Sequence, residues 1–218
     1  MNKTILIFSE THLTHLPDER KLQFFLRIVG QANEVIINGD FWDYYLTSPT
    51  LFISSLAWQP LSILLKQKSA VYLYGKHDSE TMCDGIENTF SSQLLHAYQL
   101  RQSGLTFHIE QGNTIAPDLD EIHTHAPNFI KVIGSLLDNF FTLIFKKHFL
   151  KRHKKINTLM IKRQLVHLSR STLLICGHSR YAELSPCENH ASSGSIRSGI
   201  GSYLTINNGK VSLFQETY

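Results

Sequence analysis

The stretch Glu34-Val35-Ile36-Ile37-Asn38-Gly39-Asp40-Phe41-Trp42-Asp43 joins a short apolar run to a polar turn that holds two carboxylates. The apolar run predicts a buried strand, and the glycine predicts that the strand stops where the carboxylates begin. Side chains at the carboxyl end of such a strand lie where open α/β sheets place their ligands. The stretch therefore predicts an α/β sheet with a polar site at one edge.

Four more loops of this kind occur along the chain. The apolar runs 5–8, 70–74, 105–109 and 172–176 lead into Ser9-Glu10-Thr11-His12, Gly75-Lys76-His77-Asp78, Gln111-Gly112-Asn113 and Gly177-His178-Ser179-Arg180. Helices are expected over about 19–30 and much of 53–66, and a hairpin over 201–214 around an Asn-Gly turn. A single Asp or His in one such loop is most simply a helix cap or a solvated polar residue. Five in sequence indicate a shared site.

The order of these loops resembles that of the calcineurin-like metallophosphoesterases, whose motifs are D-x-H, G-D-x-x-D, G-N-H-D/E, H-G-D/H and G-H-T-H. The resemblance covers nearly the whole chain and is best preserved over 38–45, 75–78 and 176–180. A long insertion, about 117–168, resembles the helical lid of the UDP-2,3-diacylglucosamine pyrophosphohydrolase branch. The resemblance implies one domain over 1–218, a four-layer α/β/β/α sandwich of two mixed sheets with this basic helical lid inserted.

The resemblance also implies metal-dependent phosphoryl chemistry. Two divalent metals in such sites clamp a phosphoryl group and supply a hydroxide nucleophile, and oxygen and imidazole donors suit Mn, Zn or Fe. Carried over by motif, the metal ligands would be Glu10, His12, Asp40 as the bridge, and His178. His77 would be the leaving-group acid and Asp78 its orienting partner, with Asp43 and Asn113 in support.

Several family positions carry other residues. Lys76 replaces an Asn ligand, Gln111 and Arg180 each replace a His, and Glu10 stands where Asp is usual. An ammonium or guanidinium has no lone pair for a metal, but its charge can neutralise carboxylates that would repel one another. We expect Lys76 to replace the second metal electrostatically and Arg180 the first. The site should then hold at most one divalent metal, or none.

The basic residues are concentrated in one segment. Residues 139–182 contain ten Lys and Arg and no Asp or Glu, while the remaining eleven Lys and Arg face all eighteen acidic residues and leave the rest at −7. An anionic partner is therefore expected at this segment. From Phe129 the apolar residues recur at helical spacing and then alternate with cations. Residues 129–163 either rest on an anionic membrane or pack on the protein with a solvated charged end; nucleic acid ranks lower, because no recognition motif is present.

His123 and His125 open the insertion. They are interpreted as ordinary polar residues and not as substitute metal ligands. Three cysteines without a CxxC pair favour a reducing compartment. The apolar run near the N-terminus is too short for a signal peptide or a membrane span. A cytoplasmic location, with peripheral membrane contact as a variant, is expected.

Two functions remain open on the sequence. In the first, the chain is a pseudoenzyme that binds a phosphorylated small molecule or a lipid-linked phosphate, or that has reduced phosphoesterase or pyrophosphatase activity. In the second, it is an active metal-dependent phosphohydrolase acting on a nucleotide-linked or lipid-linked phosphoester.

Overall fold

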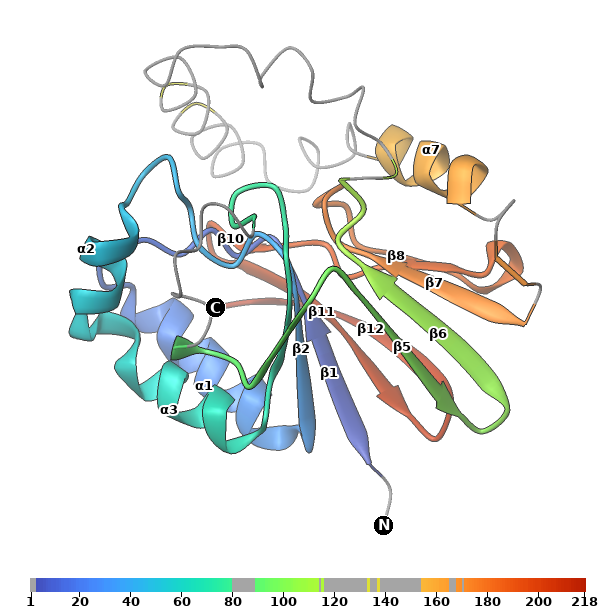
Figure 1. Ribbon diagram of the computed structural model, residues 1–218, viewed down its shortest axis with the longest axis horizontal. Helices are drawn as coiled ribbons and strands as arrows, with labels where there is room; N and C mark the ends of the chain where they lie inside the picture. Colours follow the sequence, from blue (N-terminus) through green and yellow to red (C-terminus); the bar gives the residue numbers. More distant parts are fainter. Residues whose placement is uncertain are drawn as a thin grey trace.

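The computed structural model describes residues 3–79, 89–113, 115, 133, 137, 154–164, 168–169 and 171–218. Within them, two mixed sheets lie face to face (Figure 1). Helices α1 (Glu19–Gln31) and α3 (Gln59–Gln67) lie on the outer side of the first sheet, and α7 (Lys154–Gln164) lies on the outer side of the second. The predicted α/β/β/α sandwich is confirmed.

The first sheet, as far as the structure describes it, has seven strands. Its order is β10 (Ile196–Arg197), β11 (Ile200–Asn207), β1 (Thr4–Phe8), β2 (Glu34–Asn38), β3 (Val71–Leu73) and β4 (Gln93–Leu95), and β12 (Lys210–Thr217) pairs with β11. Strands β1 to β4 are parallel, whereas β11 is antiparallel to β1. The loops after β1, β2 and β3 therefore meet at one edge.

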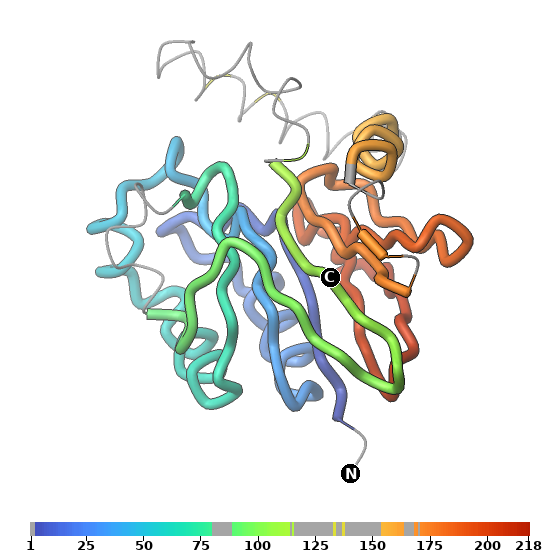
Figure 2. Tube along the Cα trace, turned by 45° about the vertical axis from the view of Figure 1, so that its right-hand side comes forward, coloured from blue at the N-terminus to red at the C-terminus, as the bar shows by residue number. Residues whose placement is uncertain are grey.

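The second sheet has five strands within the described residues. Its order is β5 (Ala97–Gln102), β6 (Leu105–Glu110), β7 (Thr172–Cys176), β9 (His190–Ser192) and β8 (Glu183–Ser185). Strands β6, β7 and β9 are parallel. Figure 2 shows that β6 ends at the same end of the molecule as the loops of the first sheet. The loops after β6 and β7 can therefore complete a site with those loops.

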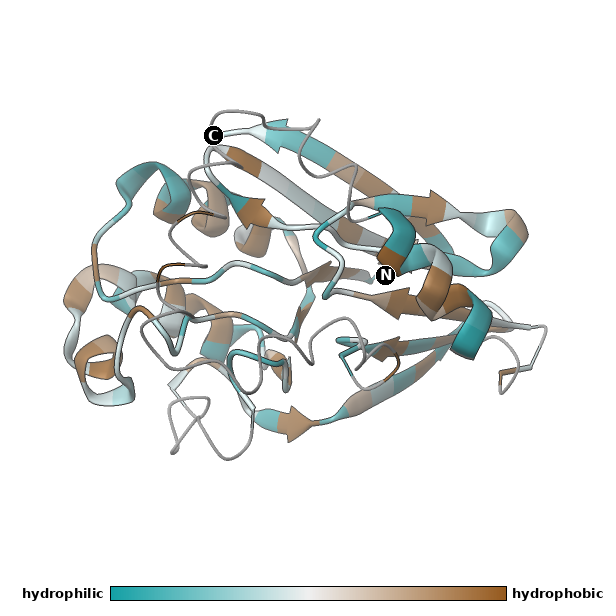
Figure 3. Ribbon diagram, turned by 90° about the horizontal axis from the view of Figure 1, so that it is seen from above, coloured by the Kyte–Doolittle hydropathy of each residue, from teal (hydrophilic) through white to brown (hydrophobic). Residues whose placement is uncertain are grey.

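Two of the apolar clusters among the described residues hold the first sheet in place. Between the sheets, Ile7, Ile36 and Leu204 pack in one cluster with Phe107 and Ile175. A second cluster lies between the first sheet and its helices. There the strand residues whose side chains point to the opposite face, such as Leu6, Phe8 and Ile37, pack against Phe25 and Leu61. Because strand side chains alternate between faces, a central strand buried on both sides needs a continuous apolar run. Figure 3 shows such apolar stretches on strands of both sheets.

The C-terminal hairpin is confirmed. Asn207 pairs with Lys210, and the two residues between them, Asn208 and Gly209, have φ of 50° and 77°. This is the left-handed backbone that a two-residue hairpin turn needs, and Asn and Gly adopt it at the lowest cost.

The helix expected over much of 53–66 is divided in the structure. A short α2 (Pro49–Ser54) ends at Ser55, a 3₁₀ turn η1 (Leu56–Trp58) follows, and α3 then begins. Ser55 has an extended backbone and its side chain accepts a hydrogen bond from Ala57 N–H. Serine caps and a proline in the first turn of α3 start new helical segments, which explains the division.

The short strands and the insertion differ in how well the sequence predicts them. Strands β4, β5, β8, β9 and β10 were not expected, whereas β1, β2, β3, β6 and β7 lie where apolar runs predicted strands. Helix α7 lies within the insertion, and Ile133 and Leu137 are helical and each 50% exposed. His123 and His125 lie outside the described residues. No described helix has the length and apolar character needed to cross a membrane.

Candidate functional site

The loops after β1 and β2 are joined through their backbones. Thr11 N–H and His12 N–H both donate to the Asp40 carbonyl, at 2.9 and 3.1 Å, and Glu10 N–H donates to Gly39 at 3.2 Å. The buried Lys21 of α1 donates from Nζ to the Thr11 carbonyl. These bonds hold Glu10, His12 and Asp40 at fixed separations.

The loop after β3 is attached to them by Asp78. Its carboxylate accepts hydrogen bonds from the backbone N–H groups of Gly75, Asp40 and Phe41, at 2.7, 2.9 and 2.6 Å, and from the Tyr72 hydroxyl at 2.5 Å. A Cβ on Gly75 would lie 2.4 Å from both the backbone N and Oδ1 of Asp40, so this close approach requires glycine. Burial, followed by repulsion from Asp40, raises the pKa of Asp78 to about 7.

Asp78 was expected to orient His77, and the structure gives it a different position. The carboxylate beside the His77 ring is that of Asp43, whose Oδ1 lies 3.5 Å from His77 Nδ1. The other oxygen of Asp43 lies 3.4 Å from His12 Nδ1. The reason is that the Asp78 carboxylate points at the backbone of its own loop and of the Asp40 loop. Its hydrogen bonds there join the two loops.

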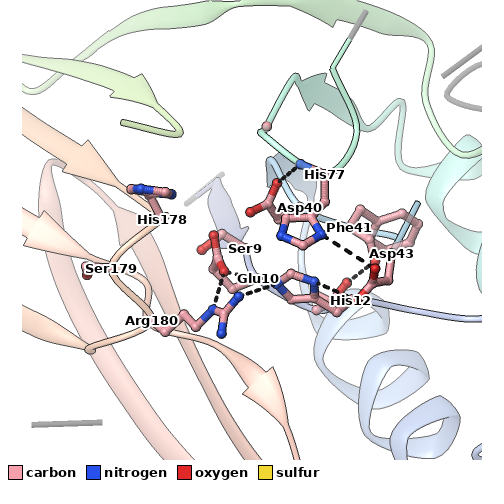
Figure 4. Close-up of polar contacts among 12 residues, drawn as sticks. Ser9, Glu10, His12, Asp40, Phe41, Asp43, His77, His178, Ser179 and Arg180 are labelled. Carbon is pink, nitrogen blue, oxygen red and sulfur yellow. Dashed lines mark hydrogen bonds and ion pairs between the residues drawn. The ribbon is translucent and has the colours of Figure 1, made fainter. Parts of the chain in front are cut away.

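His77 lies within a group of rings and carboxylates. Its ring meets that of His12 edge-on at 4.5 Å between centroids, and that of Tyr45 at 4.8 Å. Its backbone N–H donates to Asp40 Oδ1 at 2.7 Å. Figure 4 shows His12, Asp43 and His77 converging on one side of this group.

Arg180 extends from the loop after β7 to the acids of the first sheet (Figure 4). Its Nε donates to Glu10 Oε2 at 2.9 Å, and its Nη2 lies 3.4 Å from His12 Nε2. The Glu10 side chain is 1% exposed and that of Arg180 18%. Burial raises the pKa of Glu10 well above its usual range, repulsion from Asp40 adds to this, and Arg180 opposes it. Burial, followed by repulsion from Arg197, lowers the pKa of His12 to about 3, so His12 is neutral near pH 7.

Gln111, after β6, presents N–H groups to the same acids. Its Nε2 lies 3.1 Å from Glu10 Oε1, 3.2 Å from Asp40 Oδ2 and 3.3 Å from His178 Nδ1. Its Oε1 instead accepts the backbone N–H of Asn113 at 2.9 Å. Because the amide oxygen already has this partner, Gln111 offers donors and not a metal-binding oxygen to the site.

Five residues of the site have left-handed backbones. Glu10, His12, Asp40, His178 and Arg180 have φ between 37° and 56°. Each non-glycine residue in this region costs on the order of 1–3 kcal/mol, and such residues cluster at functional sites. The strand-end turns that carry these side chains therefore have the strained backbone that is typical of functional sites.

The two metal positions of the resembled family differ in how well the residues present fit them. Among the described residues, donor atoms of Glu10, His12 and Asp40 lie within 4.8 Å of one another, and so do those of His12, Asp43 and His77. The first set fits one divalent ion, although Arg180 contacts Glu10. The second family position does not fit, because beyond Asp40 and His178 it has Gln111 N–H groups and Lys76. The Lys76 side chain is half-buried at the start of its loop.

Sequence reasoning missed two buried cations. Lys21 lies on the buried face of α1, in helical register with Phe25 and Ile28, and a lysine among such apolar positions is the signal that could have revealed it. Arg197 in β10 is 5% exposed and acts electrostatically on both His12 and Lys21. It lies in a serine-rich and glycine-rich stretch whose sequence contains no comparable signal.

Comparisons with known proteins relate the chain to solved structures. No protein-family model matches it, and the comparison with curated proteins finds no match. The phosphoesterase YfcE from E. coli is 14% identical over 98% of both chains, with a TM-score of 0.50. An archaeal phosphodiesterase is 16% identical over 99% of both chains (TM-score 0.48), and Vps29 from Entamoeba histolytica, in complex with Zn²⁺, is 13% identical over 98% of both chains (TM-score 0.46). The likeness to YfcE shows that the chain has the metallophosphoesterase fold.

Proposed function

We propose that the chain binds a phosphorylated ligand at this site and hydrolyses phosphoesters slowly or not at all. The observation that carries the proposal is the 2.9 Å contact between Arg180 Nε and Glu10 Oε2, beside His12. A fixed cation thus lies against two of the three donors that the first metal would use. Its charge opposes the entry of a second cation there.

The hydrogen bonds around the acids support the same proposal. Glu10 receives N–H groups from both Arg180 and Gln111, and Asp40 receives them from Gln111 and the His77 backbone. Buried carboxylates need such partners when no metal is bound. The second sheet supplies them from positions that the resembled family uses for metal-binding histidines.

Arg180 is also suited to the ligand. A guanidinium carries five N–H donors in a planar fork that matches phosphate oxygens, so it can hold Glu10 and a phosphate oxygen together. Lys76, at a neighbouring strand end, would add a second positive charge. The shared chemistry is a phosphomonoester or pyrophosphate, carried by a small molecule or by a lipid.

Binding in the presence of chelator tests the proposal. Calorimetric titration with inorganic phosphate and a nucleoside monophosphate in EDTA should give binding that Arg180→Met weakens by about 10-fold or more, which corresponds to the loss of one charged hydrogen bond of roughly 1.5–3 kcal/mol. Arg101→Met, at an exposed strand position, is the matched control. Unchanged affinity in Arg180→Met, or no binding by the wild type, would overturn the proposal.

An active hydrolase is the second candidate. The observation that favours it is the group of Glu10, His12 and Asp40, which could hold one ion, next to the imidazole of His77. An aryl-phosphate assay across Mn²⁺, Zn²⁺ and Mg²⁺ separates the two candidates. We expect the wild type to be inactive or slow, and Lys76→Asn, Gln111→His and Arg180→His together to raise both metal content and turnover. Fast wild-type turnover that Asp40→Asn abolishes would favour the hydrolase.

The proposal includes a phosphorylated lipid of an anionic membrane as the ligand. The support is the basic composition of 129–163 and the exposure of Ile133 and Leu137, which are apolar and each half exposed. Anionic lipid attracts such cations over about one Debye length. Co-sedimentation should be stronger with anionic than with neutral vesicles, whereas equal weak binding to both would restrict the ligand to soluble phosphates.

A further inference from the structure

The pair of imidazoles around Asp43 is not explained by the proposed function. His12 Nδ1 and His77 Nδ1 face the two oxygens of the Asp43 carboxylate, at 3.4 and 3.5 Å (Figure 4). Both nitrogens are buried and have no hydrogen-bond partner. The side chains of His12 and Asp43 are 1% and 0% exposed, and that of His77 is 12% exposed. Two unsatisfied nitrogens directed at one carboxylate require a physical reason.

Hydrogen bonding does not account for these contacts. An N–H···O bond is about 2.7–3.2 Å long, shorter than either contact. His12 Nε2 lies 3.1 Å from Glu10 Oε2 and 3.4 Å from Arg180 Nη2, and a proton on Nε2 lets the neutral ring donate to Glu10, the shorter of these two contacts. The lone pair on Nδ1 then faces the Asp43 carboxylate. Two lone pairs directed at each other are unfavourable unless a cation lies between them.

The separations match those between ligands of a tetrahedral metal. With bonds of about 2.0–2.2 Å to nitrogen and oxygen, the ligands of Zn²⁺ stand roughly 3.3–3.6 Å apart along the edges of the tetrahedron. We propose that His12 Nδ1, His77 Nδ1 and the Asp43 carboxylate, whose two oxygens each face one of the imidazoles, form a site for a single zinc-class divalent ion. Two imidazoles and a carboxylate are a donor set that zinc takes in sites with an open fourth position. Water or a phosphate oxygen could fill that position.

This site differs from the family-type set in two ways. It uses Nδ1 of His12, whereas Glu10 lies on the Nε2 side, where Arg180 also approaches. It also replaces Glu10 and Asp40 by Asp43 and His77, so the ion is held by the first sheet alone. Repulsion from Arg197, which acts on His12, and from Lys21, which interacts electrostatically with Asp43, is the main opposing factor.

Zinc binding measured without any phosphate tests the inference separately from the proposed function. The full chain, stripped with chelator and titrated with Zn²⁺ against a fluorescent competitor, should bind one ion. Asp43→Asn and His77→Ala should each weaken binding by more than about 100-fold, the upper end of what loss of an outer-shell partner costs. Glu10→Gln and Asp40→Asn should change it by less than about 10-fold. Circular dichroism would confirm that each variant is folded.

A spectroscopic measurement on the wild type avoids the variants altogether. In ¹⁵N-correlated imidazole spectra, Zn²⁺ should shift Nδ1 of His12 and of His77. The inference is overturned if no zinc binds, if His12 is ligated through Nε2, or if Glu10→Gln removes the ion while Asp43→Asn does not. Failure of phosphate binding in chelator, with zinc still bound at Asp43, would overturn only the proposed function.

Discussion

The two halves of the site, one from each sheet, differ in chemical character. The loops after β1, β2 and β3 supply acceptors and imidazoles, namely Glu10, Asp40, Asp43, His12 and His77. The loops after β6 and β7 supply Gln111 and Arg180, which direct N–H groups at those acids. Apart from Lys76 in the first half and His178 in the second, acceptors therefore lie on one side of the site and donors on the other. The difference shows that donors from one sheet can pair with buried acids from the other.

The two halves of the site also differ in how their side chains are held in place. The first half is joined by backbone hydrogen bonds and by Asp78, so much of its geometry is set within one sheet. The second half reaches the acids only through the side chains of Gln111 and Arg180 in the contacts described. Substitutions in the second half should therefore change electrostatics and ligand binding before they change the fold.

The largest expected effect comes from removing the cation of the second half. Arg180→Met leaves the 1%-exposed Glu10 without its ion-pair partner, and breaking a buried pair costs roughly 3 kcal/mol of unfolding free energy. Urea unfolding in chelator measures it. The double variant Glu10→Gln, Arg180→Met should recover much of the loss, since both charges are then gone. A loss in Arg180→Met no greater than that of the exposed Arg20→Met would contradict the role given to this contact.

A smaller effect is expected from Gln111. Gln111→Met keeps the length of the side chain but removes the N–H groups that Glu10 and Asp40 share, at a cost of about 1–2 kcal/mol. Gln93→Met, at an exposed strand position, is the matched control. Urea unfolding of both variants at pH 7 gives the difference. If the two variants unfold alike, the donors of the second half are not what stabilises the acids.

The smallest expected effect is a pH dependence of the unfolding free energy that comes from Lys21, which supports the first half of the site. Burial, then repulsion from Arg197, lowers the pKa of Lys21 to about 7, while Asp18 and Asp43 oppose the shift. Between pH 7 and its unfolded value near 10.5, the unfolded chain binds this proton and the folded chain does not. Lys21 therefore makes the unfolding free energy rise with pH, by less than about 1.4 kcal/mol per pH unit. Lys21→Met should flatten the slope measured by urea unfolding from pH 7 to 9. A slope equal to that of the wild type would assign it to other groups.

Most of the fold was predictable because its signals are local. The apolar runs that became β1, β2, β3, β6 and β7 each end in a glycine-containing or polar loop, and the Asn-Gly turn fixed the C-terminal hairpin. The short strands β4, β5 and β8 to β10 were not predictable. They are two to six residues long, and cross-strand pairing, which the sequence does not show, stabilises them.

The order of residues along the chain is enough to show which chemical groups stand at the strand ends, and so that acids and imidazoles share a site with an arginine and a glutamine. How these groups pair depends on the packing of the folded chain. It placed Asp43 and not Asp78 beside His77, turned the amide of Gln111 so that its N–H groups face the acids, and brought Arg180 onto Glu10. Such pairings depend on the close approach of segments as far apart in the chain as residues 10 and 180. Local sequence patterns do not encode these distances, because the packing of the two sheets sets them.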